Sequence, residues 1–585
     1  MKRILKFFRC PELYVTLILV LVLVALKAAA PVIKNVTLER QSETKEVVLP
    51  ILERMGQGEV FSVKFGLNTG WSKELSLKLV PDDCVLDMAI NGKSVDPKRF
   101  PGYCDWASGF TLTKQDFEKY AGLQNEYKFD LKIRNNGGAA GLSALMKAGS
   151  FGSRALSIVA ALLFGLLVFL IGSRFRLHKG ILLIFLLGLA LRGVYFQNTS
   201  YSQRAYDVDG HIEYVGIVAD EHRIPDNKEC WTCYHPPLYY LSAIPFWEAS
   251  FLFDYSKPRA LQWYSFIMSA LALIFGLYCL RMLLTGGGFW LAALLWTFWP
   301  SLVMMSPRVT NEAMFCMAHV ICFWAILRYM ATKNGAYVIL SVALATMAYW
   351  AKSTGIITIA MLGLMFLVYF VPSRLLSFER KKKSEYVGLV LFLALCGIVG
   401  GLVLFNPDIV GNSKNLNSAL IVGAQPGNML YFDLENFLTH PYTSAWDDNM
   451  GRQYFLNYLA KTSLFGEFQL LKTTAGNWLA TIISISLLGL VGFALVGLWR
   501  IKWNAKTILS LAQIVMFVVA VAALRLKYPY SCSNDFRFIL PVLIPCICLS
   551  VEGIFAENGS VRRRVAGVFL VLIFSGCSTA LMLLL

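Results

Sequence analysis

Long apolar segments recur along the whole chain, and they constrain its fold more than any other feature. The runs at 153–173, 262–283 and 477–499 are examples, each close to the roughly 20 residues that an α-helix needs to cross a bilayer. Of the 585 residues, 56% are hydrophobic and only 16% are charged, which is more apolar than a water-soluble chain of this length requires. The sequence therefore predicts a polytopic α-helical membrane protein of about 13 spans.

The charge of the connections supports this reading. Spans are expected at 13–26, 153–173, 180–196, 262–283, 288–305, 311–330, 335–350, 354–371, 386–404, 477–499, 507–524, 538–554 and 565–585. With the N-terminus inside, every inner loop carries basic residues such as Arg174 and Arg500, as the positive-inside rule requires. The short apolar segment 238–253 contains Pro245 and is expected to lie at the outer interface, because a further span there would invert every later loop.

Three domains are expected. Residues 1–30 combine a basic start with an apolar run, which is either a retained membrane anchor or a cleaved signal peptide. Residues 31–150 contain alternating stretches such as VFSVKFGL and predict an extracytoplasmic β-sandwich, for which carbohydrate binding and a structural cap are both open roles. Residues 151–585 form the transmembrane catalytic domain, with large outer loops at 197–236 and 405–476.

Net charge and cysteine placement narrow the class further. The charge of +17 is typical of basic cytoplasmic loops that face anionic membrane lipids, so no nucleic-acid partner is expected. Four of the 13 cysteines lie in the β-rich segment and in the first large outer loop. Cys84 with Cys104 and Cys230 with Cys233 are candidate disulfides on an oxidising side of the membrane, while a zinc site formed by the second pair and His235 is the alternative.

Acidic and imidazole side chains gather in the first large outer loop. The segments YSQRAYDVDGHIEYV and CYHPPLYYL contain Asp207, Asp209, His211 and His235. Such groups can take a proton from an acceptor hydroxyl or hold a divalent metal ion against a phosphate. A solvated acidic loop without catalytic function is the alternative.

Cationic residues occur at the outer ends of predicted spans, against the positive-inside tendency. They are Arg308, Lys352, Arg525, Lys527 and Arg537. A lipid phosphate is their natural ligand, because ammonium and guanidinium groups neutralise the charge on a departing phosphate. Interfacial anchoring is the alternative for each of them. Glu312 opens a predicted span soon after Arg308, where capping of the helix is the simpler role.

Several short motifs in order resemble a known family. YDVDGHIEYV, HPPLYYL, PRVTNE, AKSTG and RFILPVLIP are similar to segments of the GT-C membrane glycosyltransferases of the protein O-mannosyltransferase and lipid A aminoarabinose transferase type. The resemblance covers roughly residues 175–560 and leaves out the β-rich segment. It implies a GT-C-like fold and inverting transfer of a sugar from a polyprenyl-phosphate donor to an extracytoplasmic lipid, glycan or protein acceptor.

The resemblance also implies residue roles. The family's essential acidic residue, often part of an Asp-Glu pair, corresponds to Asp207, but Val208 stands where the Glu is expected, so Asp209 competes for the catalytic role. The donor phosphate is expected to contact Arg308, Lys352 and Arg537, and the residues that frame the substrate site are expected to be His211, His235 and Glu312. Some members of the family use a divalent metal ion, so such an ion is the cofactor that the resemblance allows. No set of metal ligands in this sequence is unambiguous.

Two other functions remain open on the sequence alone. A transporter or flippase for a lipid-linked glycan would also need many spans, but such proteins tend to place polar residues near the bilayer midplane in repeated halves. An O-antigen ligase or polymerase would also use outer-face arginines and a large outer loop. The glycosyltransferase prediction places the protein in a bacterial inner membrane with its site facing the periplasm or the cell exterior.

Overall fold

The computed structural model describes the chain from residue 11 to residue 585, with gaps. These gaps are residues 30, 42, 71–74, 106–108, 137–138, 149–150, 175–177, 251–255, 371–382, 406–417, 472 and 557–559. The start of the predicted anchor and parts of the loops predicted after 371 and over 405–476 therefore lie outside the described residues. The chain divides into a first compact unit (Met1–Ala190, Phe196–Asp209 and Glu248–Leu261) and a second one (Leu191–Tyr195, Gly210–Trp247 and Gln262–Leu585).

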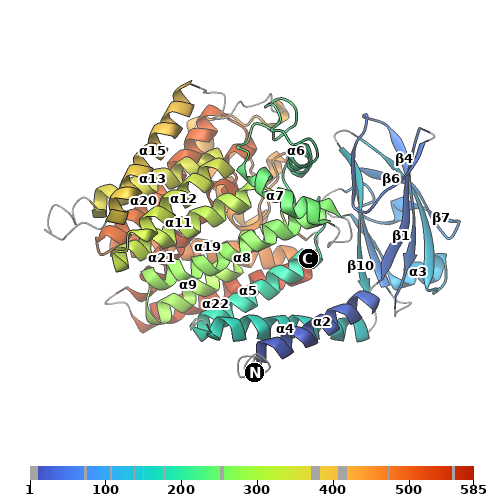
Figure 1. Cartoon of the computed structure of the whole chain (residues 1–585), viewed down its shortest axis with the longest axis horizontal. Coiled ribbons are helices and arrows are strands. Elements are labelled where there is room, and N and C mark those ends of the chain that lie inside the picture. Colours follow the sequence, from blue (N-terminus) through green and yellow to red (C-terminus); the bar gives the residue numbers. More distant parts are fainter. Residues whose placement is uncertain are drawn as a thin grey trace, which may run out of the picture. The chain divides into compact units, whose positions relative to one another are not determined.

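The described strands all belong to the first unit. They are β1 (Val32–Arg40), β2 (Glu43–Glu46), β3 (Ile51–Arg54), β4 (Val60–Asn68), β5 (Leu75–Asp82), β6 (Cys84–Ile90), β7 (Lys93–Val95), β8 (Phe110–Leu112), β9 (Glu126–Arg134) and β10 (Ala139–Ala148). They form a six-stranded sheet in the order β2-β1-β4-β9-β6-β7 and a four-stranded sheet in the order β3-β10-β5-β8. The strands appear together in blue and cyan in Figure 1.

Alternating side chains explain why this segment forms sheets. Along β9, EYKFDLKIR places every second residue in the interior, and its Phe129 stacks on Phe65 of β4 with ring centroids 4.8 Å apart. Leu79 of β5 and Leu142 of β10 join the same core from the other sheet. This shared core confirms the predicted β-rich domain as two packed sheets. The predicted disulfide between Cys84 and Cys104 is present.

Helices of the first unit follow and precede these strands. They are α2 (Pro11–Ala29), α3 (Lys114–Tyr120) and α4 (Phe151–Arg174). The two apolar helices, α2 and α4, lie side by side (Figure 1). Each contains a short apolar stretch, Tyr14–Ala25 in α2 and Ile158–Leu170 in α4.

The second unit is helical in its described part. Four helices also reach the first unit: α5 (Lys179–Gln197), α6 (Val208–Asp220), α7 (Leu238–Glu248) and α8 (Lys257–Leu283). The others are α9 (Gly286–Phe298), α10 (Pro300–Met304), α11 (Asn311–Thr332), α12 (Ala336–Ala351), α13 (Ile356–Met365), α15 (Lys383–Phe405), α16 (Pro426–Leu430), α17 (Leu434–Thr439), α18 (Phe455–Phe465), α19 (Thr474–Trp499), α20 (Ala505–Lys527), α21 (Leu543–Phe555) and α22 (Val561–Leu584). Helix α12 packs against α11, α13 and α15, and these four run side by side in Figure 1.

Eight helical segments of the described chain are long and apolar enough to cross a membrane, so the protein is an integral membrane protein. They are Lys179–Gln197, Lys257–Leu283, Asn311–Thr332, Ser384–Gly401, Thr474–Trp499, Ala505–Lys527, Ser531–Phe555 and Val561–Leu584. Five shorter apolar helices coincide with the other predicted spans, so the total of about 13 remains a prediction. Helix α7, expected at the interface, has 11 residues and is too short to span a bilayer.

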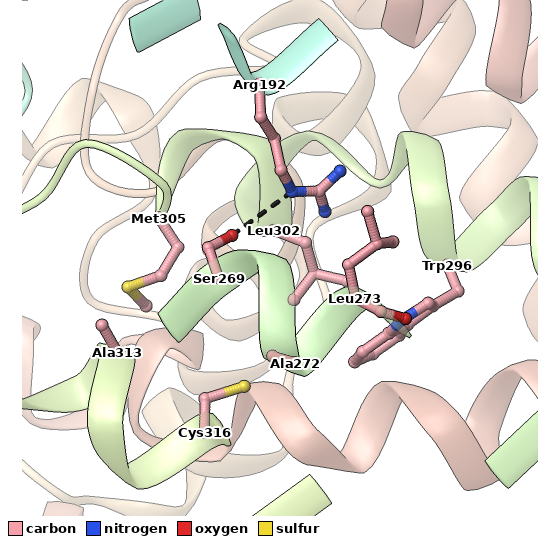
Figure 2. Close-up of a pocket in the computed structure, with 9 residues that line it drawn as sticks. All are labelled: Arg192, Ser269, Ala272, Leu273, Trp296, Leu302, Met305, Ala313 and Cys316. Atoms are coloured by element: carbon pink, nitrogen blue, oxygen red, sulfur yellow. Dashed lines mark hydrogen bonds between the residues drawn. The ribbon is translucent and has the colours of Figure 1, made fainter. Parts of the chain in front are cut away.

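A buried arginine on one helix forms hydrogen bonds to two neighbouring helices. Arg192 of α5 is 2% exposed, and its Nε donates to Ser269 Oγ of α8 at 3.3 Å (Figure 2). Its Nη1 donates to the carbonyl oxygen of Thr297 in α9 at 3.0 Å. These bonds satisfy a cation at membrane depth, and Figure 2 shows apolar side chains such as Leu302 around it. We regard this arginine as a packing element that the sequence prediction missed.

Candidate functional site

The start of one helix and the end of the next meet at the site. Helix α11 begins at Asn311, and the amide of Asn311 donates to the carbonyl oxygen of Ala351, the last residue of α12, at 3.1 Å. The antiparallel arrangement of the two packed helices therefore brings Glu312, in the first turn of α11, close to Lys352, which follows α12.

Glu312 and Lys352 form a buried ion pair. The ammonium group of Lys352 donates to Glu312 Oε1, and the two side chains are only 8% and 5% exposed, Lys352 and Glu312 respectively. Capping of α11 falls instead to Thr310, whose Oγ1 accepts from the backbone N–H of Glu312. The expected capping role of Glu312 is thus replaced by charge pairing. A buried pair of this kind is sensitive to the loss of either partner, because the remaining charge is left uncompensated.

Arg537 adds a second cation to the same carboxylate. Its Nε lies 3.8 Å from Glu312 Oε1 and 3.8 Å from Asp535 Oδ2. Asp535 begins the 3-10 helix η9 (Phe536–Val542), where its Oδ1 accepts from the backbone N–H of Arg537 at 2.8 Å. The Phe538 ring lies 4.6 Å from Lys352 Nζ and 5.0 Å from Arg537 Cζ, within cation–π range. We call Glu312, Lys352 and Arg537 the cation cluster.

One carboxylate oxygen of the cation cluster is available to accept a hydrogen bond from a ligand. In the described part of the chain, Glu312 Oε2 is buried and has no hydrogen-bond donor within reach. A buried acceptor without a partner costs free energy unless a ligand or water supplies a donor. The cation cluster therefore combines groups that attract an anion with an acceptor suited to a hydroxyl.

Two histidines border the cation cluster. His211 of α6 exchanges a hydrogen bond of 2.9 Å with the hydroxyl of Tyr240, and its ring lies parallel to that of His235, with centroids 5.9 Å apart. Burial, followed by the electrostatic interactions with Lys352 and His211, lowers the pKa of His235 well below its usual value. His235 is therefore neutral near pH 7, and it can donate or accept a hydrogen bond without adding charge.

Arg308 has a different environment. It is 4% exposed and lies in the segment before α11, with its guanidinium carbon 5.3 Å from the centroid of the Phe468 ring.

Contacts or electrostatic interactions join five of the eight predicted site residues. These are Glu312, Lys352, Arg537, His211 and His235.

Asp207 and Asp209 belong to the first unit, where they form an acidic group with two residues that the sequence prediction missed. Those residues are Asp82, at the end of β5, and Asp83. Burial, then the charges of Asp207 and Asp83, raises the pKa of Asp209 to about 6. Burial, then Asp209 and Asp83, raises the pKa of Asp82 to about 8. We call these four residues the acidic group. Asp207 is exposed, whereas Asp209 is half-buried in the first turn of α6.

The zinc alternative for Cys230 and Cys233 is wrong. The two cysteines form a disulfide, so neither thiolate is available as a metal ligand. Across the described ranges, no three His, Cys, Asp or Glu side chains form a group that could hold a metal ion. The disulfide has a structural role instead, because it closes the loop that leads to His235, and Cys230 Sγ lies 4.0 Å from the carbonyl oxygen of Gly210 in α6.

An aromatic cavity lies beside His235. Its volume is about 140 Å³, and its walls include Tyr214, Asn227, Tyr234, His235, Tyr349 and Trp350. On the sequence, Tyr349 and Trp350 are typical of an interfacial aromatic belt, and no local signal joins them to Tyr234. Only the packing of α12 against the loop after the Cys230–Cys233 disulfide reveals this cavity.

Comparison with solved structures gives a weak likeness, whereas the other comparisons find no match. None of the protein-family models matches the sequence, and no curated protein matches it either. Among solved structures, the chain is similar to the arabinosyltransferase EmbB from Mycobacterium smegmatis, with a TM-score of 0.33 and 10% sequence identity. The alignment covers 93% of this chain and 53% of that one, so this chain spans about half the length of that protein. At this low TM-score and identity, the likeness says nothing about the chemistry of this chain.

Proposed function

We propose that the protein is a membrane glycosyltransferase that moves a sugar from a polyprenyl-phosphate donor to an acceptor outside the cytoplasm. The observation that carries the proposal is the cation cluster, in which Lys352 and Arg537 meet at one buried carboxylate. The cluster is built from the ends of helices α11 and α12 and from η9, which precedes α21. Helix ends of an integral membrane protein are where a lipid phosphate is found.

The cluster suits the departure of a phosphate. In a single inverting displacement, an acceptor oxygen bonds to the anomeric carbon while the bond from that carbon to the phosphate oxygen breaks. The electron pair stays on the polyprenyl phosphate, which gains negative charge. An ammonium and a guanidinium group held in place before the reaction stabilise that charge without reorganisation, and such groups contribute roughly 10²–10³-fold each to the rate. Arg308 is a further candidate for the phosphate on the basis of the sequence motif alone.

The proton of the acceptor hydroxyl needs a base. On the sequence resemblance, we assign this role to Asp209, with Asp207 as the alternative. The pKa of about 6 for Asp209 supports the choice, because a general base works best when its pKa is near the working pH. The acceptor is a lipid, a glycan or a protein, and we propose no metal ligand set.

A transporter is the main rival, and the contacts of two polar groups inside the helices favour the transferase. Such proteins need polar groups near the bilayer midplane that are available to a substrate. His319 of α11 is engaged by Thr358 Oγ1 and Gln513 Nε2, both at 2.8 Å, and Arg192 bonds to α8 and α9. These groups bind neighbouring helices, as packing contacts do, and the cation cluster lies at helix ends.

The test is transfer by the purified protein in lipid nanodiscs. A panel of prenyl-phosphate monosaccharides is supplied with a crude envelope acceptor, and released prenyl phosphate is measured. We expect at least one donor to be turned over, and Arg537→Ala to lower kcat/KM by about 10²–10³-fold. Arg562→Ala is the matched control, because Arg562 is an exposed cation near the start of α22, at a helix end that is expected on the inner side of the membrane.

Two results would contradict the proposal. One is an Arg537→Ala protein that turns over the donor as fast as the wild type. The other is a protein that ignores every monophosphate donor but transfers glycan from a prenyl diphosphate, which would identify a ligase or polymerase.

A further inference from the structure

The aromatic cavity beside His235 has a size that few ligands match. Its volume of about 140 Å³ is close to the roughly 150 Å³ of an engineered protein cavity that admits one benzene molecule. It is smaller than the roughly 300–1,000 Å³ of pockets for drug-sized ligands. The cavity therefore fits a single ring and excludes an oligosaccharide or a long peptide segment.

The walls of the cavity select for a neutral ring with an apolar face and polar edges. Tyr214, Tyr234, Tyr349 and Trp350 offer ring faces for C–H groups, and the phenol hydroxyls, the Asn227 amide and His235 offer hydrogen-bonding edges. The other walls are Ile224, Cys233 and three prolines (Pro225, Pro236 and Pro237), so the experiment has to separate a sugar ring from an isoprenoid chain.

The charges in and around the cavity also restrict the kind of ligand that it can bind. No Lys, Arg, Asp or Glu lines the described cavity, so a phosphate would find no counter-ion inside it. Lys352 and Arg537 both help to lower the pKa of His235, which shows that a positive potential reaches this wall of the cavity. A cationic ligand is therefore disfavoured as well.

From these observations we infer that the cavity is a monosaccharide subsite that binds one neutral sugar ring next to the phosphate-binding cations. This inference rests on the proposed function and names the part of the substrate that the cation cluster does not hold. Trp350 and Lys352 are separated by one residue at the end of α12, so a single helix end supplies a ring face and a phosphate cation. The ring is either the sugar of the donor or a sugar of the acceptor.

The experiment separates sugar recognition from phosphate recognition. Binding of a farnesyl phosphate without sugar is compared with binding of farnesyl-phosphate glucose, mannose, galactose and arabinose, using the full chain in nanodiscs. We expect the wild type to prefer at least one glycosylated lipid, and Trp350→Ala to lose about tenfold of that preference while its affinity for the sugar-free lipid is unchanged. Trp350→Phe should keep most of the preference, and Trp499→Ala, at an 89% exposed tryptophan, is the matched control.

A second arm identifies the source of the sugar. If Trp350→Ala leaves donor binding unchanged but abolishes binding of the corresponding methyl glycosides, the cavity holds the acceptor sugar. Equal weakening of the sugar-free and glycosylated lipids would overturn the inference, because it would identify an isoprenoid site. Absence of any sugar preference in both arms would overturn it too. Failure of the proposed function looks different, since Lys352→Ala would then leave the affinity for the sugar-free farnesyl phosphate unchanged.

Discussion

The cation cluster of the second unit and the acidic group of the first both gather ionisable side chains, but with opposite arrangements of sign. In the cation cluster, the carboxylate of Glu312 lies between the positive charges of Lys352 and Arg537. In the acidic group, all four side chains are aspartates, and their mutual repulsion adds to burial in raising the pKa of Asp209 and of Asp82. Opposite charges offset the cost of burial, whereas like charges increase it.

This difference separates two chemical tasks. Paired charges keep their protonation state over a wide range of pH, so they can hold a ligand of fixed charge. A carboxyl group with a pKa near 6 changes its protonation state close to neutral pH, as acid–base catalysis requires. On the proposed function, the cation cluster would bind the phosphate and the acidic group would take the proton, and each of these two proposed roles can be tested separately.

The largest expected effect comes from the acidic group. Asp209→Asn should slow sugar transfer by about 10²–10⁴-fold, because the amide cannot accept the proton of the acceptor hydroxyl. The affinity for farnesyl phosphate should stay the same, since the cation cluster is intact. Single-turnover transfer in nanodiscs measures the first quantity, and lipid binding measures the second.

Asp207→Asn is the matched variant for this prediction. Asp207 is exposed, whereas Asp209 is half-buried, so the structure favours Asp209 for the larger loss. A greater loss in Asp207→Asn would reverse the assignment between the two residues. Full transfer activity in both variants would remove proton transfer from the acidic group altogether.

An effect on stability is expected next, in the cation cluster. Lys352→Met removes the cation that bonds directly to the buried carboxylate of Glu312, and breaking a buried pair in this way costs about 3–5 kcal/mol of unfolding free energy. The double variant Lys352→Met with Glu312→Gln removes both charges and should recover part of that loss. Thermal unfolding in detergent, followed by tryptophan fluorescence, measures all three proteins.

A double variant that is not more stable than Lys352→Met would contradict this prediction. If the double variant is no more stable than Lys352→Met, the two side chains do not compensate each other and the ion pair is not what stabilises this part of the protein. Transfer activity should be low in both variants, because each lacks the ammonium group proposed for the phosphate.

The sequence predicts individual members of the cation cluster better than their partners. Lys352 and Arg537 stand out because cations at the outer ends of spans are unusual, and the structure brings them together. Glu312 was expected as a helix cap, since a carboxylate in a first turn has a local explanation. Its pairing with Lys352, 40 positions along the chain, depends on how α11 packs against α12, which no local pattern encodes.

In the fold, too, local sequence patterns predict the elements, whereas contacts between residues far apart in the chain are not predicted. The alternation along β9 predicts a strand with one buried face, and the four cysteines of the β-rich segment and the first outer loop pair as two disulfides. Asp82 could not be predicted as a neighbour of Asp209, because it ends a strand 127 residues earlier and only tertiary packing makes the two interact. Periodicity and spacing identify elements, whereas the partners of a buried charge follow from packing.

The smallest expected effect is a shift in pH dependence within the acidic group. Because the pKa of Asp209 is raised to about 6, its carboxylate is lost as pH falls through 6, and the transfer rate should drop about tenfold per pH unit below that point. Asp83→Asn removes one of the like charges that raise this pKa, so the acid limb should move to lower pH by less than about one unit. His235→Asn should leave the limb in place, because His235 is already neutral at these pH values. An acid limb that follows His235 and ignores Asp83 would transfer the proton-accepting role from the acidic group to the histidine beside the cation cluster.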